Sequence, residues 1–92
     1  MNKADLVDEV AARTGQTKVA VAAAVEAMME TIIESVAGAE SVTLSGFGTF
    51  EPKQRRARTG RNPRTGVEVP IPPKTVPAFR PGNTFKDQVE AD

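Results

Sequence analysis

The chain has 92 residues with 12 basic and 12 acidic side chains, and it contains no cysteine, histidine, tryptophan or tyrosine. This length suits one domain, and the composition excludes disulfides, thiolate metal sites and the commonest general base, so we expect no enzyme, metal or cofactor. No apolar run could cross a membrane and the start, MNKADLVDEV, is no secretory signal peptide, which predicts a soluble intracellular protein without membrane contact.

The first half is predicted to be helical, because every proline lies at residue 52 or later. Asn2 can cap a first helix, with Asp5 in its first turn and Gly15 just after its end. An acid in the first turn is favourable because of the helix dipole. The apolar stripe of this helix consists of Leu6, Val7, Val10 and Ala11.

A second, longer helix is predicted from about Lys18 to Ala37, with Thr17 as its cap and Gly38 ending it. Its apolar residues recur at spacings of three and four, as one buried face requires. They are Val21, Val25, Met28, Ile32 and Val36.

Strands are predicted after the helices. Residues 41–45 alternate, GFGTF then supplies a tight turn, and a second strand should run from Thr49 into the arginines. Residues 67–71 alternate again and predict a returning strand, in which Pro70 and Pro72 lack donors and belong at an edge or in a free ribbon. VPAFRPG then leads the chain back to the body.

A short final helix is predicted from Asn83 to Val89, packing Phe85 and Val89. The residues outside the arginine-rich segment are few for a hydrophobic core, and the long helix has more apolar face than one short sheet can cover. We therefore expect a dimer in which two long helices and two sheets share one core. Phe47, Phe50 and Phe79 are predicted to lie in that core.

The stretch RRARTGRNPRTG, residues 55–66, contains five arginines and no acid around Asn62 and Pro63. Residues 1–51 hold three basic side chains against eight acids, whereas residues 52–92 hold nine against four, and such asymmetry indicates a charged partner for one half. Gly60 and Gly66 bracket the Asn-Pro pair and favour a turn, so the stretch is predicted to be the tip of a two-stranded arm over about residues 53–76.

A basic ribbon suits nucleic acid. Its cations can neutralise phosphates, the ribbon fits a groove, and the flat ring of Pro63 suits a wedge between base pairs. Taken alone, Pro63 is an ordinary turn residue. Two other interpretations stay open: a binder of structured RNA, and a protein-interaction module whose exposed basic ribbon binds acidic partners.

The segments GFGTF, ARTGRNPRTG and VPAFRPG, in this order and spacing, resemble the bacterial histone-like DNA-binding proteins, the HU and integration host factor family, and most closely HU. MNKADLV and FKDQV fit the same pattern, so the resemblance covers essentially the whole chain. It implies an α+β fold with two N-terminal helices, a three-stranded antiparallel sheet, a protruding β-ribbon arm and a short C-terminal helix. It also implies an intertwined dimer that condenses and bends DNA in the nucleoid of the bacterial cytoplasm.

Under this resemblance, one DNA-binding domain spans residues 1–92. It divides into a helical dimerisation part over 1–38, a sheet with its arm over 41–82, and a final helix over 83–92. Pro63 corresponds to the intercalating wedge, which enters the minor groove. The other implied DNA contacts are Arg58, Arg61 and Asn62 near the wedge, Lys53, Arg55, Arg56 and Arg64 along the arm, Arg80 and Lys86 between the arms, and Lys3 and Lys18 on the flanks.

The chain departs from the family pattern in its charge, because family members are usually strongly basic and this chain is neutral. Asn83 stands where a lysine is common, and Gln54 where an acid is common. We therefore expect DNA contact to depend on the arms more than on wrapping around the flanks, with a short binding site. The sequence favours double-stranded DNA without strict sequence preference, above all nicked, gapped or distorted duplexes. A homodimer is simplest, and a heterodimer with a paralogue stays open.

Overall fold

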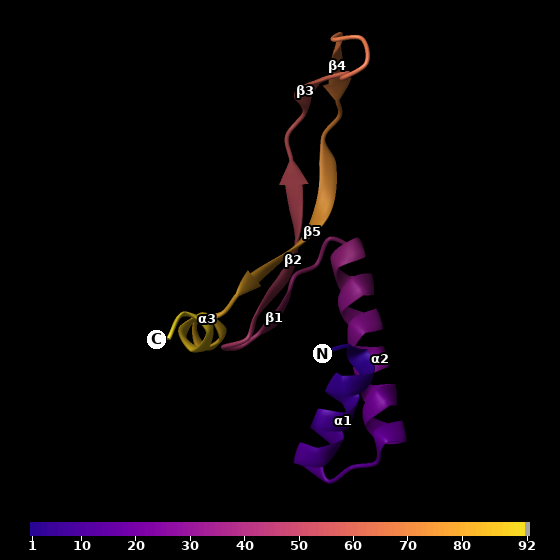
Figure 1. The fold of residues 1–92 in the computed structure, drawn as a ribbon, viewed down its shortest axis with the longest axis vertical. Helices are drawn as coiled ribbons and strands as arrows, with labels where there is room; N and C mark the ends of the chain where they lie inside the picture. Colours follow the sequence, from indigo (N-terminus) through magenta and orange to yellow (C-terminus); the bar gives the residue numbers. More distant parts are fainter. Residues whose placement is uncertain (92) are drawn as a thin grey trace. The chain divides into compact units, whose positions relative to one another are not determined.

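The protein, described here by a computed structural model over residues 1–91, has the predicted α+β composition (Figure 1). It divides into two compact units, residues 1–34 and a second unit that begins at Ser35. The helices and strands in chain order are α1 (Lys3–Thr14), α2 (Lys18–Ala37), β1 (Val42–Leu44), β2 (Gly48–Arg55), β3 (Arg58–Arg61), β4 (Glu68–Ile71), β5 (Lys74–Pro81) and α3 (Asn83–Glu90).

The two ends of α1 are fixed by the residues that the sequence indicated. The Asn2 side chain accepts a hydrogen bond from the Asp5 amide at 2.9 Å, and the Asp5 carboxylate accepts one from the Asn2 amide at 3.1 Å. This reciprocal arrangement is a capping box, which satisfies two otherwise unpaired donors. Gly15 ends the helix in the left-handed conformation at φ 73°. The predicted cap of α2 is confirmed as well, because Thr17 Oγ1 accepts from the Ala20 amide at 3.1 Å.

The first unit has a small core. Val7 and Ala11 of α1 are buried together with Val21 of α2, and Val10, Ala22 and Val25 pack against them. The predicted stripes were wider than this core, because Leu6 and Met28 are 43% and 49% exposed. Two helices of one chain cover only part of each other's apolar face, so these side chains remain open in the single chain.

The C-terminal end of α2 differs from the prediction in its detail. The Glu40 amide donates to the Ser35 carbonyl at 2.8 Å and the Ala39 amide to the Val36 carbonyl at 3.0 Å. This is the Schellman pattern, and its left-handed position is occupied by Ala39, at φ 67°, rather than by Gly38. A side chain at positive φ is unfavourable, since its Cβ lies too close to the neighbouring carbonyl.

We predict that Ala39→Gly stabilises the protein by about 0.5–1 kcal/mol, because glycine removes the left-handed penalty while losing some chain entropy. The measurement is the free energy of unfolding in urea. The same substitution on the exposed, helical Ala23 is the control and should destabilise by about 1 kcal/mol. Equal losses at both positions would contradict the strain assigned to Ala39.

The second unit contains an antiparallel sheet in the order β1–β2–β5. The predicted GFG turn joins β1 to β2, and its backbone also holds α3 in place. The Gly46 carbonyl accepts from the Phe85 amide at 3.1 Å, in the first turn of α3, while the Gly82 amide donates to the Phe47 carbonyl at 2.8 Å. Since α3 has no side-chain cap, the Gly46 carbonyl accepts from one of the amides that would otherwise be unpaired at the start of this helix.

Four phenylalanines gather on this sheet and α3. Phe79 lies 4.9 Å from Phe50, 5.6 Å from Phe47 and 5.9 Å from Phe85 between ring centroids. Phe47 and Phe79 are nevertheless 46% and 40% exposed in the single chain. The prediction that α3 packs Val89 as well as Phe85 is wrong for the single chain, because Val89 is 70% exposed.

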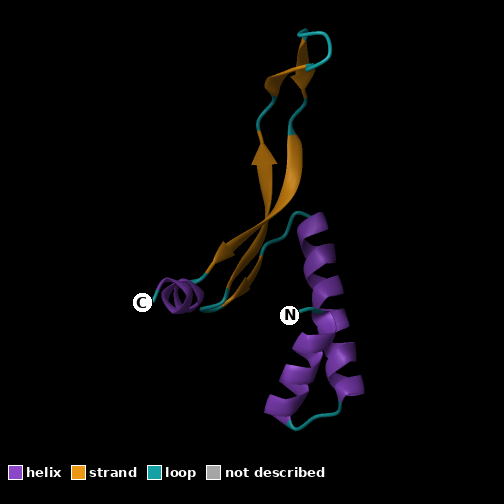
Figure 2. Ribbon diagram, in the orientation of Figure 1, coloured by secondary structure: helices purple, strands orange, loops and turns teal. Residues whose placement is uncertain are grey.

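The arm differs from the continuous hairpin that the sequence suggested. β2 pairs with β5 as far as the pair Arg55–Lys74, and β3 pairs with β4 as a separate two-stranded sheet that begins at Arg58–Ile71 (Figure 2). The second predicted strand is therefore interrupted after Arg55. The register is the same on both sides of the interruption, with two unpaired residues on each strand.

Candidate nucleic-acid interface

The tip of the arm is a turn over residues 62–66 that its own hydrogen bonds define. The Asn62 amide donates to the Val67 carbonyl at 2.9 Å, and the Gly66 amide donates to the Asn62 carbonyl at 2.8 Å. The Asn62 side-chain oxygen accepts from the Arg64 amide at 2.9 Å, which closes a turn around Pro63. Gly66 takes the left-handed conformation at φ 71° that this turn requires. Pro63 is therefore exposed on a tip whose backbone is held by its own hydrogen bonds.

The cations along the arm are exposed and free of acidic partners. Within residues 1–91, no salt bridge involves any cation between residues 52 and 66. Unpaired charges on a ribbon are available to neutralise phosphates, with release of counterions. These cations are Lys53, Arg55, Arg56, Arg58, Arg61 and Arg64, all of them predicted from the sequence.

Most of the predicted contacts outside the arm are, in contrast, already paired with acids. Lys3 forms an ion pair with Glu26, and Lys18 Nζ lies 3.2 Å from the Asp8 carboxylate. Arg80 lies at the base of the sheet, 3.6 Å from the carboxylate of its neighbour Glu51. Lys86 is exposed on α3 and takes part in none of the ion pairs found in the described residues.

Two charged residues of the returning strands were missed from the sequence. Lys74 lies directly opposite Arg55, and Glu68 lies directly opposite Arg61. The charge count for residues 52–92 included both, but neither was assigned to the interface. Lys74 adds to the basic surface of the arm. Glu68 is exposed and its carboxylate makes no salt bridge within residues 1–91, so it places a negative charge where phosphates would approach.

We predict that Glu68→Gln strengthens duplex DNA binding about fivefold at low salt, since two arms each lose a repulsion on the order of 0.5 kcal/mol. Fluorescence anisotropy with a labelled duplex would measure this. Glu40→Gln removes the same charge from an exposed position outside the arm and is the control. Equal gains from both variants would mean that net charge, rather than position, sets the affinity.

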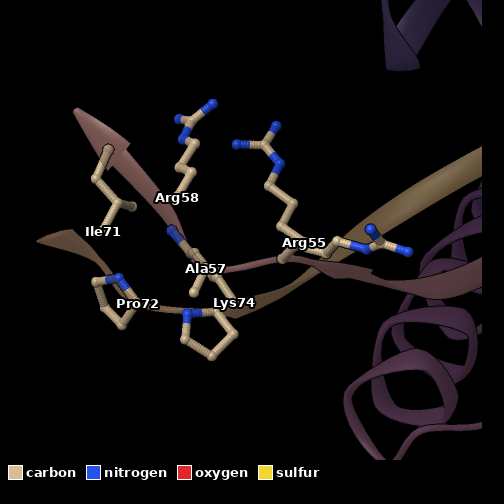
Figure 3. Close-up of a pocket in the computed structure, with 8 residues that line it drawn as sticks. Arg55, Ala57, Arg58, Ile71, Pro72 and Lys74 are labelled. Atoms are coloured by element: carbon tan, nitrogen blue, oxygen red, sulfur yellow. The ribbon is translucent and has the colours of Figure 1, made fainter.

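The arm also has a hollow where its ladder is interrupted. It measures about 790 Å³, and its lining combines cations with apolar side chains (Figure 3). Elsewhere, no cluster of three potential metal ligands occurs among residues 1–91. No helix of the described chain is long and apolar enough to span a bilayer. The arm, from its interruption after Arg55 to its tip, is therefore the candidate nucleic-acid interface.

Comparison with known proteins gives the family of the chain. Residues 1–90 match the family described as bacterial DNA-binding protein. The DNA-binding protein HU of Staphylococcus aureus is 49% identical over 90 residues, covering 98% of this chain and all of the relative. That of a Nostoc strain is 48% identical over 89 residues, covering 97% of this chain and 95% of the relative.

Solved structures give the same result for the fold. An Anabaena HU–DNA cocrystal structure matches with a TM-score of 0.92 and 47% identity, covering both chains completely. HU from Thermotoga maritima matches with a TM-score of 0.70 and 33% identity, over 98% of this chain and all of that one.

The fold and the basic arm thus define a bacterial DNA-binding protein of the architectural, histone-like kind. The chain belongs to the bacterial DNA-binding protein family, and within that family its similarity is to HU.

Proposed function

We propose that two copies of this chain form a dimer whose basic arms enter the minor groove of duplex DNA and bend it at Pro63. One observation supports this above the others: exposed, unpaired cations line a ribbon that ends in an exposed proline. Binding of this kind organises and compacts DNA without chemistry on it. We place the protein in the bacterial cytoplasm, on the nucleoid, and assign it no enzymatic activity.

Affinity in this proposal comes from the phosphates. Each phosphate that a lysine or arginine neutralises releases counterions, which strengthens binding without reading the sequence. The minor groove presents nearly the same acceptors for A·T and T·A pairs, so contacts there discriminate poorly between sequences. Binding is therefore largely independent of sequence, and it favours duplexes that are already nicked, gapped or distorted.

The tip supplies the bend. Pro63 presents an apolar ring without a donor, which can enter between base pairs and unstack one step. The Asn62 oxygen is already used by the Arg64 amide, so the Asn62 NH₂ group is the part left to donate to groove acceptors. Arg58 and Arg61, nearest along the ribbon, hold phosphates while the wedge is inserted.

The helices α1 and α2 contribute less to DNA binding than the arms do. Lys3 and Lys18 are each engaged by an acid of the same unit. DNA passing along the flanks would break these ion pairs and meet the acids that they release. We therefore assign the main contact to the arms, and a short binding site to the dimer.

Dimerisation has its own support in the apolar surface that one chain leaves open. Phe47 and Phe79 are large and exposed, although both belong to a ring cluster. Exposed apolar side chains of this size in a cluster mark an interface. One chain contains every part that the two-armed dimer requires, so we propose a homodimer. The alternative is a heterodimer with a paralogue.

Pro63→Ala provides the test. Wild type should prefer a nicked duplex over its intact counterpart by about tenfold or more, and the variant should lose this preference, because a nick removes part of the unstacking energy that the wedge must supply. Both proteins should keep the same steep dependence of affinity on salt, since the cations are unchanged. Binding of both duplexes is measured by anisotropy across a salt series.

The same titrations separate the alternatives. A binder of acidic protein surfaces would show no gain from the nick and no effect of Pro63→Ala. A binder of structured RNA would favour an RNA duplex in direct competition, although the wide, shallow minor groove of A-form RNA fits a narrow ribbon poorly. Either result would overturn the proposed function.

A further inference from the structure

The net charge of zero is the sum of two halves of opposite sign. Residues 1–51 hold three basic side chains against eight acids, whereas residues 52–92 hold nine against four. Duplex DNA is a partner for the basic half only, so the acidic half is left without one. Proteins whose net charge is near zero also lack the mutual repulsion that keeps copies apart in solution. A second copy of this chain is therefore a partner of matching charge for both halves.

The acidic half presents its charge on an open face of α2. Glu30, Ile33 and Glu34 are exposed and stand three and four positions apart, so they form one patch on the helix surface, the α2 patch. Glu30 follows the buried Val21 by nine residues, or about two and a half turns, which places it on the opposite side of the helix. A partner that covers the apolar stripe of α2 therefore leaves the α2 patch open, with Ile33 67% exposed in the single chain.

The α2 patch has no cation of its own. Within residues 1–91, neither Glu30 nor Glu34 takes part in a salt bridge, whereas Glu26, one turn earlier, pairs with Lys3. Carboxylates four positions apart on a helix repel each other. Glu34 also lies in the last turn of α2, where the helix dipole disfavours an acid, and this turn contains no basic residue. Cations supplied from outside the chain would relieve both effects.

The inner ribbon of the arm, formed by β2 and β5, presents the opposite charge. Lys53 and Arg55 are two residues apart on β2, so their side chains lie on the same face. Lys74 lies directly opposite Arg55, and the half-buried Val76 lies directly opposite Lys53. The three cations, the arm patch, are exposed and belong to none of the ion pairs found in the described residues. The outer ribbon, formed by β3 and β4, is a separate sheet that leads to the tip.

The two patches match in spacing as well as in charge. Glu30 and Glu34 are about 6 Å apart along the helix axis, at about 1.5 Å per residue. Lys53 and Arg55 are about 6.6 Å apart along the strand, at about 3.3 Å per residue. One strand can therefore place a cation against each acid at the same time. The exposed Ile33 between the acids can pack on the apolar stem of a lysine or arginine.

We propose that DNA-free dimers associate with one another, the arm patch of one dimer binding the α2 patch of another. Duplex DNA carries one negative charge per about 1.7 Å of helix axis, whereas the α2 patch offers two charges over about 6 Å, so DNA displaces the α2 patch from the arm. The association covers the basic arms only while no duplex is bound, and it competes with DNA binding. The inference rests on the proposed function for the dimer and for this competition.

Sedimentation velocity of the wild-type protein without DNA is the first test. Exposed ion pairs are individually weak, so the association is expected at about 100 μM protein rather than at micromolar concentration. At about 0.02 M salt, species larger than the dimer should form, and at about 0.3 M, where screening is stronger, only dimers should remain. A wild type that is dimeric at both salt concentrations would overturn the proposal.

Glu30→Gln/Glu34→Gln removes the acids of the α2 patch and should weaken the association by about tenfold or more. The variant should fold, since it also removes a repulsion within α2. Asp87→Asn/Glu90→Gln is the matched control, because it removes two negative charges from exposed positions of α3 that form no ion pair among residues 1–91. This control should associate as wild type does. Equal weakening by both variants would refute the α2 patch as the binding surface.

Two further readouts identify what occupies the α2 patch. In NMR spectra at low salt, the amide shifts of residues 30–34 and 53–55 should change together with protein concentration, while those of residues 86–90 should stay constant. Adding one short duplex per dimer should return the protein to DNA-bound dimers, because the duplex and the α2 patch compete for the same cations. Shifts confined to α2, or assemblies that persist with duplex bound, would refute the arm as the occupant.

Failure of this inference is distinguishable from failure of the proposed function. If the protein binds no duplex, the proposed function fails, and the association is decided by the DNA-free measurements alone. If wild type binds duplex with the preference that Pro63 provides, yet stays dimeric at low salt, only this inference fails. At about 0.3 M salt, Glu30→Gln/Glu34→Gln should bind duplex as wild type does, because the α2 patch is then unoccupied in both proteins.

Discussion

Replacing Arg58 and Arg61 together by glutamine will weaken binding to intact duplex DNA by roughly 10³-fold at 0.1 M salt, because a dimer then loses up to four phosphate contacts. The slope of log affinity against log salt should become shallower by about 3 to 4 for the same reason. Both side chains lie on the outer ribbon next to the tip, exposed and without an acidic partner. A salt series by anisotropy measures affinity and slope together.

Lys3→Gln/Lys18→Gln removes the same number of charges and is the matched control. Each of these lysines already has an acidic partner, so the slope should change by less than about 1. The length of DNA covered per dimer, found by titrating duplexes of increasing length, should stay the same. A large effect of the lysine pair together with a long footprint would contradict the arm-centred proposal and favour wrapping around the body.

The contrast between these variants follows from how the charge is distributed. The chain is neutral overall, yet its positive charge is exposed and unpaired on the arm. Interactions between exposed charges farther apart than about 8–10 Å are screened at physiological salt. A phosphate held by Arg61 therefore responds most to the charges that lie next to Arg61 on the arm, such as Glu68 on the opposite strand. Net charge alone would have given the wrong expectation for this protein.

Local features of the fold were predictable because their causes are local. Asn2 and Asp5 lie three residues apart, as a capping box requires, and α1 begins directly after Asn2. The alternating pattern around Val42 and the paired glycines of GFG likewise placed β1 and the following turn. In such cases a few neighbouring residues contain both the donor and the acceptor, and sequence order alone indicates the contact.

Features that depend on distant partners were not predictable. Lys3 pairs with Glu26 across 23 positions, and no spacing rule connects them. The interruption of the arm could not be inferred from Pro72 and Pro73 alone, because their effect depends on the hydrogen-bond phase of each ribbon. Once the register is known, the cause follows from the missing N–H groups. The roles of the DNA-contacting residues, including Pro63, remain predictions that the binding measurements will test.

Phe79→Ala is expected to have the largest effect on stability, a loss of about 3–5 kcal/mol. The ring packs 4.9, 5.6 and 5.9 Å from three other phenylalanine centroids and is still 40% exposed in one chain. In the proposed dimer this exposed part is covered by the partner, so truncation removes contacts within the chain and between chains at once. Urea unfolding should show the loss, and its midpoint should depend on protein concentration.

Sedimentation equilibrium at micromolar concentration supplies the second readout, in which wild type should be a dimer and Phe79→Ala largely monomeric. Val89→Ala is the control, because a side chain 70% exposed should change stability by no more than about 0.5 kcal/mol. A monomeric wild type would refute the dimer directly. A dimeric Phe79→Ala of unchanged stability would move the interface away from the phenylalanine cluster. The arms could then still bind DNA, but the cluster would have no part in bringing two of them together.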